Sequence, residues 1–347
     1  MKKKQLLVTF VALAVLAALF AWGCQHFHFH FGQLWEQMKL ANWWMVLLGI
    51  GCIYIAYLFR AFRWGYLMRH SRQVSPWSLV SSQVIGFTAV ALIGRVADPV
   101  RPFLVSKKTG SLLSTQFAVY VVERLFDFGS MAIIIFSVLL LSPPGSIPHQ
   151  EIVHQFGSKG LIGTVGAAVF LLFVRLAGNW VAALFEKAFG LLSPSLGHAA
   201  GQKIRAFHAG LDNMRSVKDL IMVLSLSLTM WGLITYAYIA TLRAFVACPE
   251  LADMNLSRGI LIMAISGAAS SLQLPIIGWF TQIGLVAAAL SGILGVAPEA
   301  ATAAAAGLLL VTFLCIIPVG LIWAQFENIS LRSIATESGK AGCELKS

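Results

Sequence analysis

Long apolar stretches without a charged residue dominate this chain and limit what it can fold into. They are Leu6–Trp22, Trp43–Phe59, Phe128–Leu141, Gly160–Val174, Leu220–Leu242, Gly259–Pro298 and Ala300–Gln325. Most approach the roughly 20 apolar residues that a membrane-spanning helix needs. With 58% hydrophobic and only 11% charged residues, against about 25% charged in ordinary soluble domains, a soluble core cannot hold them. The sequence predicts an all-α polytopic membrane protein.

The positive charges indicate the orientation of the chain. The formal net charge is +11, but Lys and Arg do not gather with aromatic residues as they would for nucleic acid. With the basic N-terminus inside, nearly all cations lie on the inner side, as the positive-inside rule requires. The few outer cations are Lys39, Lys159, Arg243 and Arg258. We therefore expect a multi-pass protein of the bacterial inner (plasma) membrane with both termini cytoplasmic.

Two stretches, Pro76–Gly110 and Gly259–Pro298, have the pattern of broken membrane hairpins. Paired interrupted segments in matching places of two halves are typical of transporters built from inverted repeats. The spans that we expect around them are Gln5–Gly23, Asn42–Arg69, Ser114–Ser142, Lys159–Leu176, Asp219–Ala247 and Glu299–Glu327. The sequence thus predicts about six spans plus two re-entrant helical hairpins in an inverted-topology repeat, although full crossing of the second hairpin stays open.

This pattern divides the chain into five parts. A first span and an outer interfacial segment occupy residues 1–41, and the first repeat (span, hairpin, span) occupies 42–142. Residues 143–218 contain an outer loop, a span and a cytoplasmic amphipathic linker. The second repeat covers 219–327 and a cytoplasmic tail covers 328–347. We expect Arg60, Arg63 and Arg69, near the end of the second span, to extend to the inner surface.

Glu123, Arg124 and Asp127 lie within the Ser114–Ser142 span. Carboxylates at i and i+4 share one helix face, and each charge at bilayer depth costs at least about 2.5 to 3.5 kcal/mol on insertion scales. The three side chains should therefore face the protein interior. They either contact a substrate head group or form an ion-pair cluster that holds the span to the first hairpin.

The first hairpin supplies the natural partners, Arg95, Asp98 and Arg101. Guanidinium groups bind phosphate bidentately, so the arginines favour a phosphate-bearing lipid head group as ligand. The alternative is that they only neutralise the carboxylates. In the second hairpin, Gln273, Pro275 and Gln282 put neutral polar groups at the expected break, where they can line a cavity.

Nothing in the sequence indicates a reaction, a cofactor or a metal. The run His26–His30 has alternating histidines and would suit a metal, but no nearby carboxylate cluster completes a site, which favours an aromatic and polar interfacial belt. Cys24 and Cys248 are both expected at outer helix ends, where they either form a disulfide or are unrelated thiols. We found no catalytic motif.

The segments Gly94–Pro102 and Val121–Asp127, with a weaker Pro275–Gly284 segment, resemble the flippase-like family related to the transmembrane region of lysylphosphatidylglycerol synthase. The resemblance implies lipid head-group translocation, and relatives occur joined to lipid-modifying or polyprenyl-phosphate-sugar enzymes. The family usually has Gly-Glu where this chain has Ala97-Asp98. Its second motif is rich in Pro-Gly-Gly and is followed by a glutamate, whereas this chain has neutral Gln282.

We therefore expect a flippase that moves an anionic lipid or lipid-linked head group, either a phospholipid or a polyprenyl-phosphate-linked sugar, between leaflets. Arg95, Arg101 and Arg124 would receive the head group. Two alternatives remain: an intramembrane enzyme that transfers a sugar or phosphoryl group on a lipid carrier, and a non-transporting scaffold for a lipid-modifying enzyme. We expect no modifying domain in this chain, so a separate lipid-modifying or glycosyltransferase enzyme is a candidate partner, and a homodimer is left open.

Overall fold

A computed structural model describes residues 31–69, 72–143, 150–191, 193–198, 201–202, 205, 217–271 and 277–327. Throughout these ranges the regular structure is helical, without a strand. The predicted first span, the histidine run, Cys24, most of the amphipathic linker and the tail lie outside the described residues.

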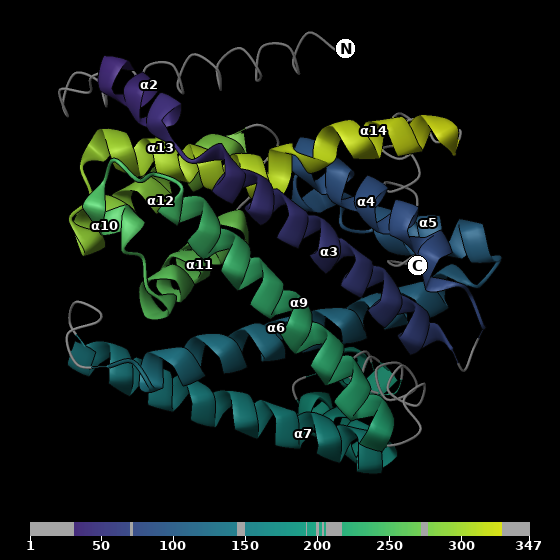
Figure 1. Cartoon of the computed structure of the whole chain (residues 1–347). Helices are drawn as coiled ribbons and strands as arrows, with labels where there is room; N and C mark the ends of the chain where they lie inside the picture. The colour runs from purple at the N-terminus through teal and green to yellow at the C-terminus, as the bar shows by residue number, and fades with distance from the viewer. Residues whose placement is uncertain are drawn as a thin grey trace, which may run out of the picture.

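The helices follow one another with short connections (Figure 1). The N-terminal half contains α2 (Phe31–Leu40), α3 (Trp43–Met68), α4 (Pro76–Ile93), the short 3₁₀ helix η1 (Arg95–Ala97), α5 (Val100–Thr109), α6 (Leu113–Leu140) and α7 (Gln150–Gly190). The C-terminal half contains α9 (Val217–Arg243), α10 (Pro249–Ala252), α11 (Leu256–Ser271), α12 (Ile277–Leu294), α13 (Pro298–Leu309), the π-helix η2 (Leu310–Leu314) and α14 (Ile316–Phe326).

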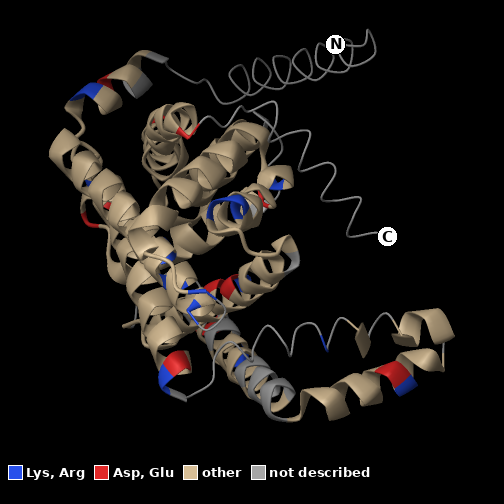
Figure 2. Ribbon diagram, turned by 90° about the vertical axis from the view of Figure 1, so that its right-hand side faces the viewer, with Lys and Arg blue, Asp and Glu red and all other residues tan. Residues whose placement is uncertain are grey.

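Long apolar helices cross one another at the centre of the molecule. In the described part, four helical segments are long and apolar enough to cross a membrane: Trp43–Met68, Pro76–Ile93, Lys218–Arg243 and Pro298–Phe326. Helix α3 packs along α9, α6 along α7 and α4 against α14. Charged residues are sparse on these ribbons, and a group of them lies inside where several helices meet (Figure 2).

The first predicted hairpin is a broken pair of helices. Helix α4 begins with Pro76 at its first turn and ends at Ile93. The next residue is Gly94, whose φ of 84° lies in a region that favours glycine. After η1, α5 has 10 residues and is only about 15 Å long, which is too short to cross a core of about 30 Å. The helix is therefore interrupted at the position that Gly94 and Pro99 predict, and α5 packs against α4.

The second predicted hairpin corresponds to α11, with 16 residues, and α12, with 18. These helices are about 24 and 27 Å long, close to but short of a 30 Å core. The turn between them, residues 272–276, lies outside the described residues. The division into repeats, the number of crossings and the membrane orientation stay predictions.

Helix α7 differs from expectation. The predicted outer loop, Pro143–Ser158, is already helical from Gln150. The same helix runs on to Gly190, past the predicted end of the span at Leu176, with a kink at Ala177 (φ −129°, ψ 32°). The predicted end of the span thus coincides with a kink and not with the end of a helix.

Candidate functional site

Helix α6 carries the centre of the candidate site. Glu123 and Asp127 are one turn apart and are both buried, whereas the Arg124 side chain keeps 21% of its surface exposed. Glu123 and Asp127 therefore point into the protein, as predicted. A buried carboxylate requires cationic or hydrogen-bonding partners because desolvation is so unfavourable.

Two of those partners come from α3 and were not expected. Arg63 places its Nη2 2.8 Å from Glu123 Oε1 and its Nη1 2.7 Å from Asp127 Oδ1. Arg60 lies 3.4 Å from the second Asp127 oxygen. Both arginines are buried, so the expectation that they extend to the inner surface is wrong.

The position of the arginines on α3 explains this difference. Arg60 and Arg63 are about 12 and 8 Å before the helix end at Met68, at 1.5 Å per residue, and their shared face is turned toward α6. Arg69, beyond the helix end, is half-exposed and pairs with Asp219. The sequence feature that could have identified Arg60 and Arg63 as partners is that Glu123 and Asp127, if buried, need nearby cations.

Arg101 of α5 completes the buried part of the cluster. Its Nη1 lies 3.0 Å from Glu123 Oε2 and donates to Gln83 at 3.2 Å. Its guanidinium also lies over three aromatic rings, with ring-centroid distances of 4.5 Å to Phe87, 5.1 Å to Tyr120 and 5.6 Å to Trp64. The Arg101 side chain is fully buried, and cation–π contacts of this kind become stronger when water is excluded.

A second group of charges, Arg95, Asp98 and Arg124, forms the accessible edge of the cluster. Arg124 lies 3.3 Å from Asp98, and Arg95 lies 3.9 Å from the other Asp98 oxygen. The side chains of Arg95, Arg124 and Asp98 are 33%, 21% and 18% exposed. Arg124 also lies 3.8 Å from the buried Asp127, whereas Arg95 can meet a ligand without a rearrangement of the buried ion pairs.

The accessible edge lies where the two hairpins touch. Arg95 donates from Nε to the Ser270 carbonyl at 3.0 Å and from Nη2 to the Ser270 hydroxyl at 3.1 Å. In return, Trp279 Nε1 donates to the Ala91 carbonyl at 2.9 Å. Residues of α4 and η1 are thus bonded to residues of α11 and α12.

The second-hairpin candidates do not join the charged cluster by any contact seen among the described residues. Gln282, 2% exposed, donates to Ser266 at 3.0 Å, and Ser266 lies 2.8 Å from the Tyr238 hydroxyl. This neutral group lies one turn of α11 away from Ser270. Gln273 and Pro275 lie outside the described residues.

The cluster as a whole has an excess of positive charge. Its members in the described ranges are the arginines 60, 63, 95, 101 and 124 and the acids Asp98, Glu123 and Asp127. Five cations minus three anions leave a formal charge of +2. Low-dielectric surroundings strengthen the attraction of such a group for an anion. No group of three or more metal-ligating side chains occurs in the part of the chain that was described.

Apolar helices around a buried arginine–carboxylate cluster define a multi-pass membrane protein. The chain belongs to the family described as the lysylphosphatidylglycerol synthase TM region, whose model matches residues 9–320. No curated protein and no solved structure gives a significant match.

Proposed function

We propose that this protein moves an anionic lipid or lipid-linked head group between the two leaflets of the bacterial inner membrane. The lipid is a phospholipid or a polyprenyl-phosphate-linked sugar, and the protein catalyses no chemical reaction on it. Membership of the family supports a role connected with lipid modification or translocation. The proposal of transport depends on the chemistry of the candidate site.

One observation carries the proposal: partly exposed guanidinium groups of a cluster with formal charge +2 lie at the contact between two helical hairpins. Arg95 and Arg124 are the groups that a head group can reach, and bidentate guanidinium–phosphate bonds suit a lipid phosphate. Broken helices near the midplane are where transporter sites form. The head group would pass through this polar region while its tails stay in lipid.

The members of the site have different roles in this proposal. Arg60, Arg63 and Arg101 hold Glu123 and Asp127 and thereby fix α3, α5 and α6 together. Asp98 keeps the two accessible arginines in place. Gln273, Pro275 and Gln282 would contribute neutral polar groups from the second hairpin.

The test is lipid translocation in proteoliposomes that contain the purified protein and a fluorescent phosphatidylglycerol. Arg95→Gln removes an accessible cation without breaking a buried ion pair. We expect the translocation rate to fall at least about tenfold. A hydrogen bond to a charged group contributes about 1.5 to 3 kcal/mol, and 1.4 kcal/mol corresponds to a factor of ten. Arg205→Gln is the matched control, since Arg205 pairs with Glu186 far from the cluster in sequence and is 42% exposed.

Translocation by folded Arg95→Gln at the wild-type rate would exclude the proposed site. No translocation of phosphatidylglycerol or of a polyprenyl-phosphate sugar by the wild type would reject transport and favour the scaffold alternative. A change in the mass of the added lipid would instead favour the intramembrane enzyme.

A further inference from the structure

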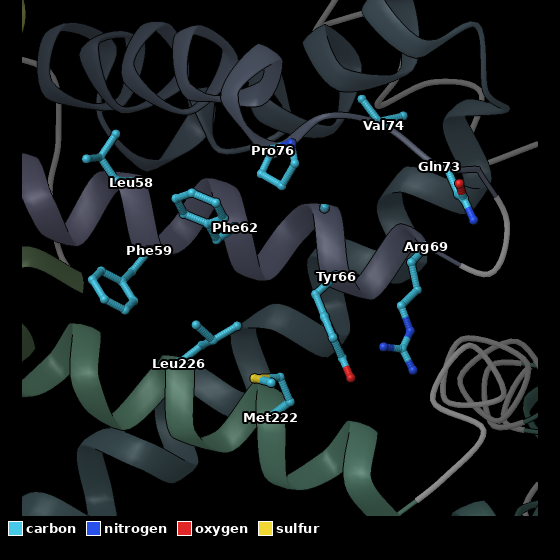
Figure 3. Close-up of a pocket in the computed structure, with 11 residues that line it drawn as sticks. Leu58, Phe59, Phe62, Tyr66, Arg69, Gln73, Val74, Pro76, Met222 and Leu226 are labelled. Atoms are coloured by element: carbon cyan, nitrogen blue, oxygen red, sulfur yellow. The ribbon is translucent and has the colours of Figure 1, made fainter.

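A groove separate from the charged cluster lies between α3, α9 and the start of α4 (Figure 3). Its volume is about 580 Å³, within the range of about 300 to 1,000 Å³ typical of ligand sites. Phe59 and Tyr66 extend from α3 toward Met222 and Leu226 of α9, whereas Phe62 lies on the side of α3 that faces Pro76 at the start of α4. Both helices are long and apolar enough to cross the membrane, so the groove lies beside the lipid tails.

The groove and the charged cluster use different faces of α3. Phe59, Phe62 and Tyr66 follow a spacing of three and four residues and share one face. Arg60 and Arg63 are each one residue further on, about 100° around the helix, and point to Glu123 and Asp127. A molecule in the groove is therefore separated from the cluster by the helix itself.

One end of the groove is apolar and the other is cationic. Leu58, Phe59 and Leu226 line the part nearer the middle of α3, whereas Tyr66, Arg69 and Gln73 line the part at its C-terminal end. This order of polarity matches an amphiphile that lies along α3 with its head at the end of the helix.

One ion pair, between Arg69 and Asp219, lies at the cationic end of the groove, where the head of the amphiphile would lie. The Arg69 guanidinium stacks on the Tyr66 ring, 4.0 Å from its centroid, and pairs with the buried Asp219. Tyr66 also donates to Asp219 at 3.2 Å. Two exposed cations, Arg72 and Lys218, lie next to this group in the chain. Three cations minus one carboxylate leave +2 here, and each Lys or Arg near an anionic lipid surface contributes about 1 kcal/mol of attraction.

We propose that this groove binds a resident anionic phospholipid of the leaflet that meets the C-terminal end of α3. One acyl chain lies between Phe59, Phe62 and Leu226, and the phosphate lies at Arg69. This lipid stays bound between α3 and α9 and is not the molecule that the hairpins move. The proposal requires only that the chain spans a membrane, and it does not depend on transport.

The tail part is tested by filling the groove. Native mass spectrometry of the purified protein, titrated with 1-palmitoyl-2-oleoyl phosphatidylglycerol, measures the bound lipid. We expect Leu226→Trp to weaken binding about tenfold or more, because the indole occupies the space of the acyl chain. Ile221→Trp is the matched control, since Ile221 lies on the same helix, is 60% exposed and is not part of the groove lining; it should bind as the wild type does.

The head part is tested with the double variant Arg72→Gln/Lys218→Gln, which removes the two exposed cations that give this end of the groove its excess positive charge and leaves the Arg69–Asp219 pair in place. The wild type should prefer phosphatidylglycerol over phosphatidylcholine with the same tails about tenfold, and the double variant should lose this preference. The thermal unfolding midpoint, which rises when a ligand binds only the folded state, provides a second readout.

Equal binding of both lipids by the wild type would overturn the anionic-head assignment. Unchanged binding by folded Leu226→Trp would overturn the groove itself. Neither result bears on Arg95 and the translocation assay, so the two proposals fail separately.

Discussion

At the scale of single residues, the path of Arg101 depends on the missing side chain at position 86. A Cβ added to Gly86 would lie 2.1 Å from Arg101 Cγ and 3.1 Å from Cδ. The first distance is far below van der Waals contact. Glycine thus lets α4 approach α5 closely enough for Arg101 to reach Glu123.

We predict that Gly86→Ala lowers the free energy of unfolding by about 1 to 3 kcal/mol, the usual cost of overpacking a core. The comparison is Gly51→Ala on α3, where no atom lies within 4 Å of the added Cβ. That variant should be as stable as the wild type or more stable by about 0.5 to 1 kcal/mol, since alanine favours helices. Unfolding in detergent measures both, and equal shifts in the two variants would contradict the prediction.

At the scale of elements, the segment from α13 to α14 is interrupted by a π-helix. Cys315 donates its N–H to the Leu310 carbonyl at 2.9 Å, and Pro318 has no N–H to donate. Side chains of other helices bind the carbonyls there. Tyr54 donates to the Cys315 carbonyl at 2.8 Å, and Thr88 donates to the Ile316 carbonyl at 3.2 Å. The irregular turn is thereby attached to α3 and α4.

Tyr54→Phe should lower the free energy of unfolding by about 0.5 to 1.5 kcal/mol, the net value of a typical hydrogen bond. The ring remains, so packing is kept and only the bond to the Cys315 carbonyl is lost. Tyr236→Phe, at a side chain that is 51% exposed, should change stability little. The same unfolding measurement decides, and a Tyr54→Phe protein as stable as this control would argue against a role for the hydroxyl.

At the scale of the whole molecule, the polar contacts seen between the two hairpins among the described residues are those of Arg95 with Ser270 and of Trp279 with Ala91. The break at Gly94 lies between Ala91 and Arg95. The chain around the break at Gly94 should therefore be ordered in part by its contact with Trp279 of α12.

Trp279→Phe removes the indole N–H that binds the Ala91 carbonyl. We predict faster amide hydrogen exchange at Gly94–Asp98, because local opening becomes easier when a tertiary contact is lost. Trp231→Phe is the control, since Trp231 Nε1 has no hydrogen-bond partner among the described residues. Mass spectrometry of the exchanged protein measures the effect, and unchanged exchange in Trp279→Phe would show that the contact does not order the break.

Much of the helical architecture was predictable because its causes are local. Hydropathy placed the helices α3, α6 and α9 close to their observed positions, and Asn42 caps α3 by accepting from the Trp44 N–H at 3.1 Å. The break at Gly94 was predictable because glycine and proline act on their own backbone. The inward face of Glu123 and Asp127 followed from the helical period.

The sequence by itself determined that the chain is an all-helical membrane protein and that charge on α6 must be compensated, because hydropathy, helical period and the cost of buried charge can be read along one segment. Only the tertiary structure decided which cations compensate it. In the sequence, nothing distinguishes the buried Arg60 and Arg63 from the more exposed Arg69. Their pairing depends on which face of α3 meets α6, and that is set by packing between helices distant in the chain.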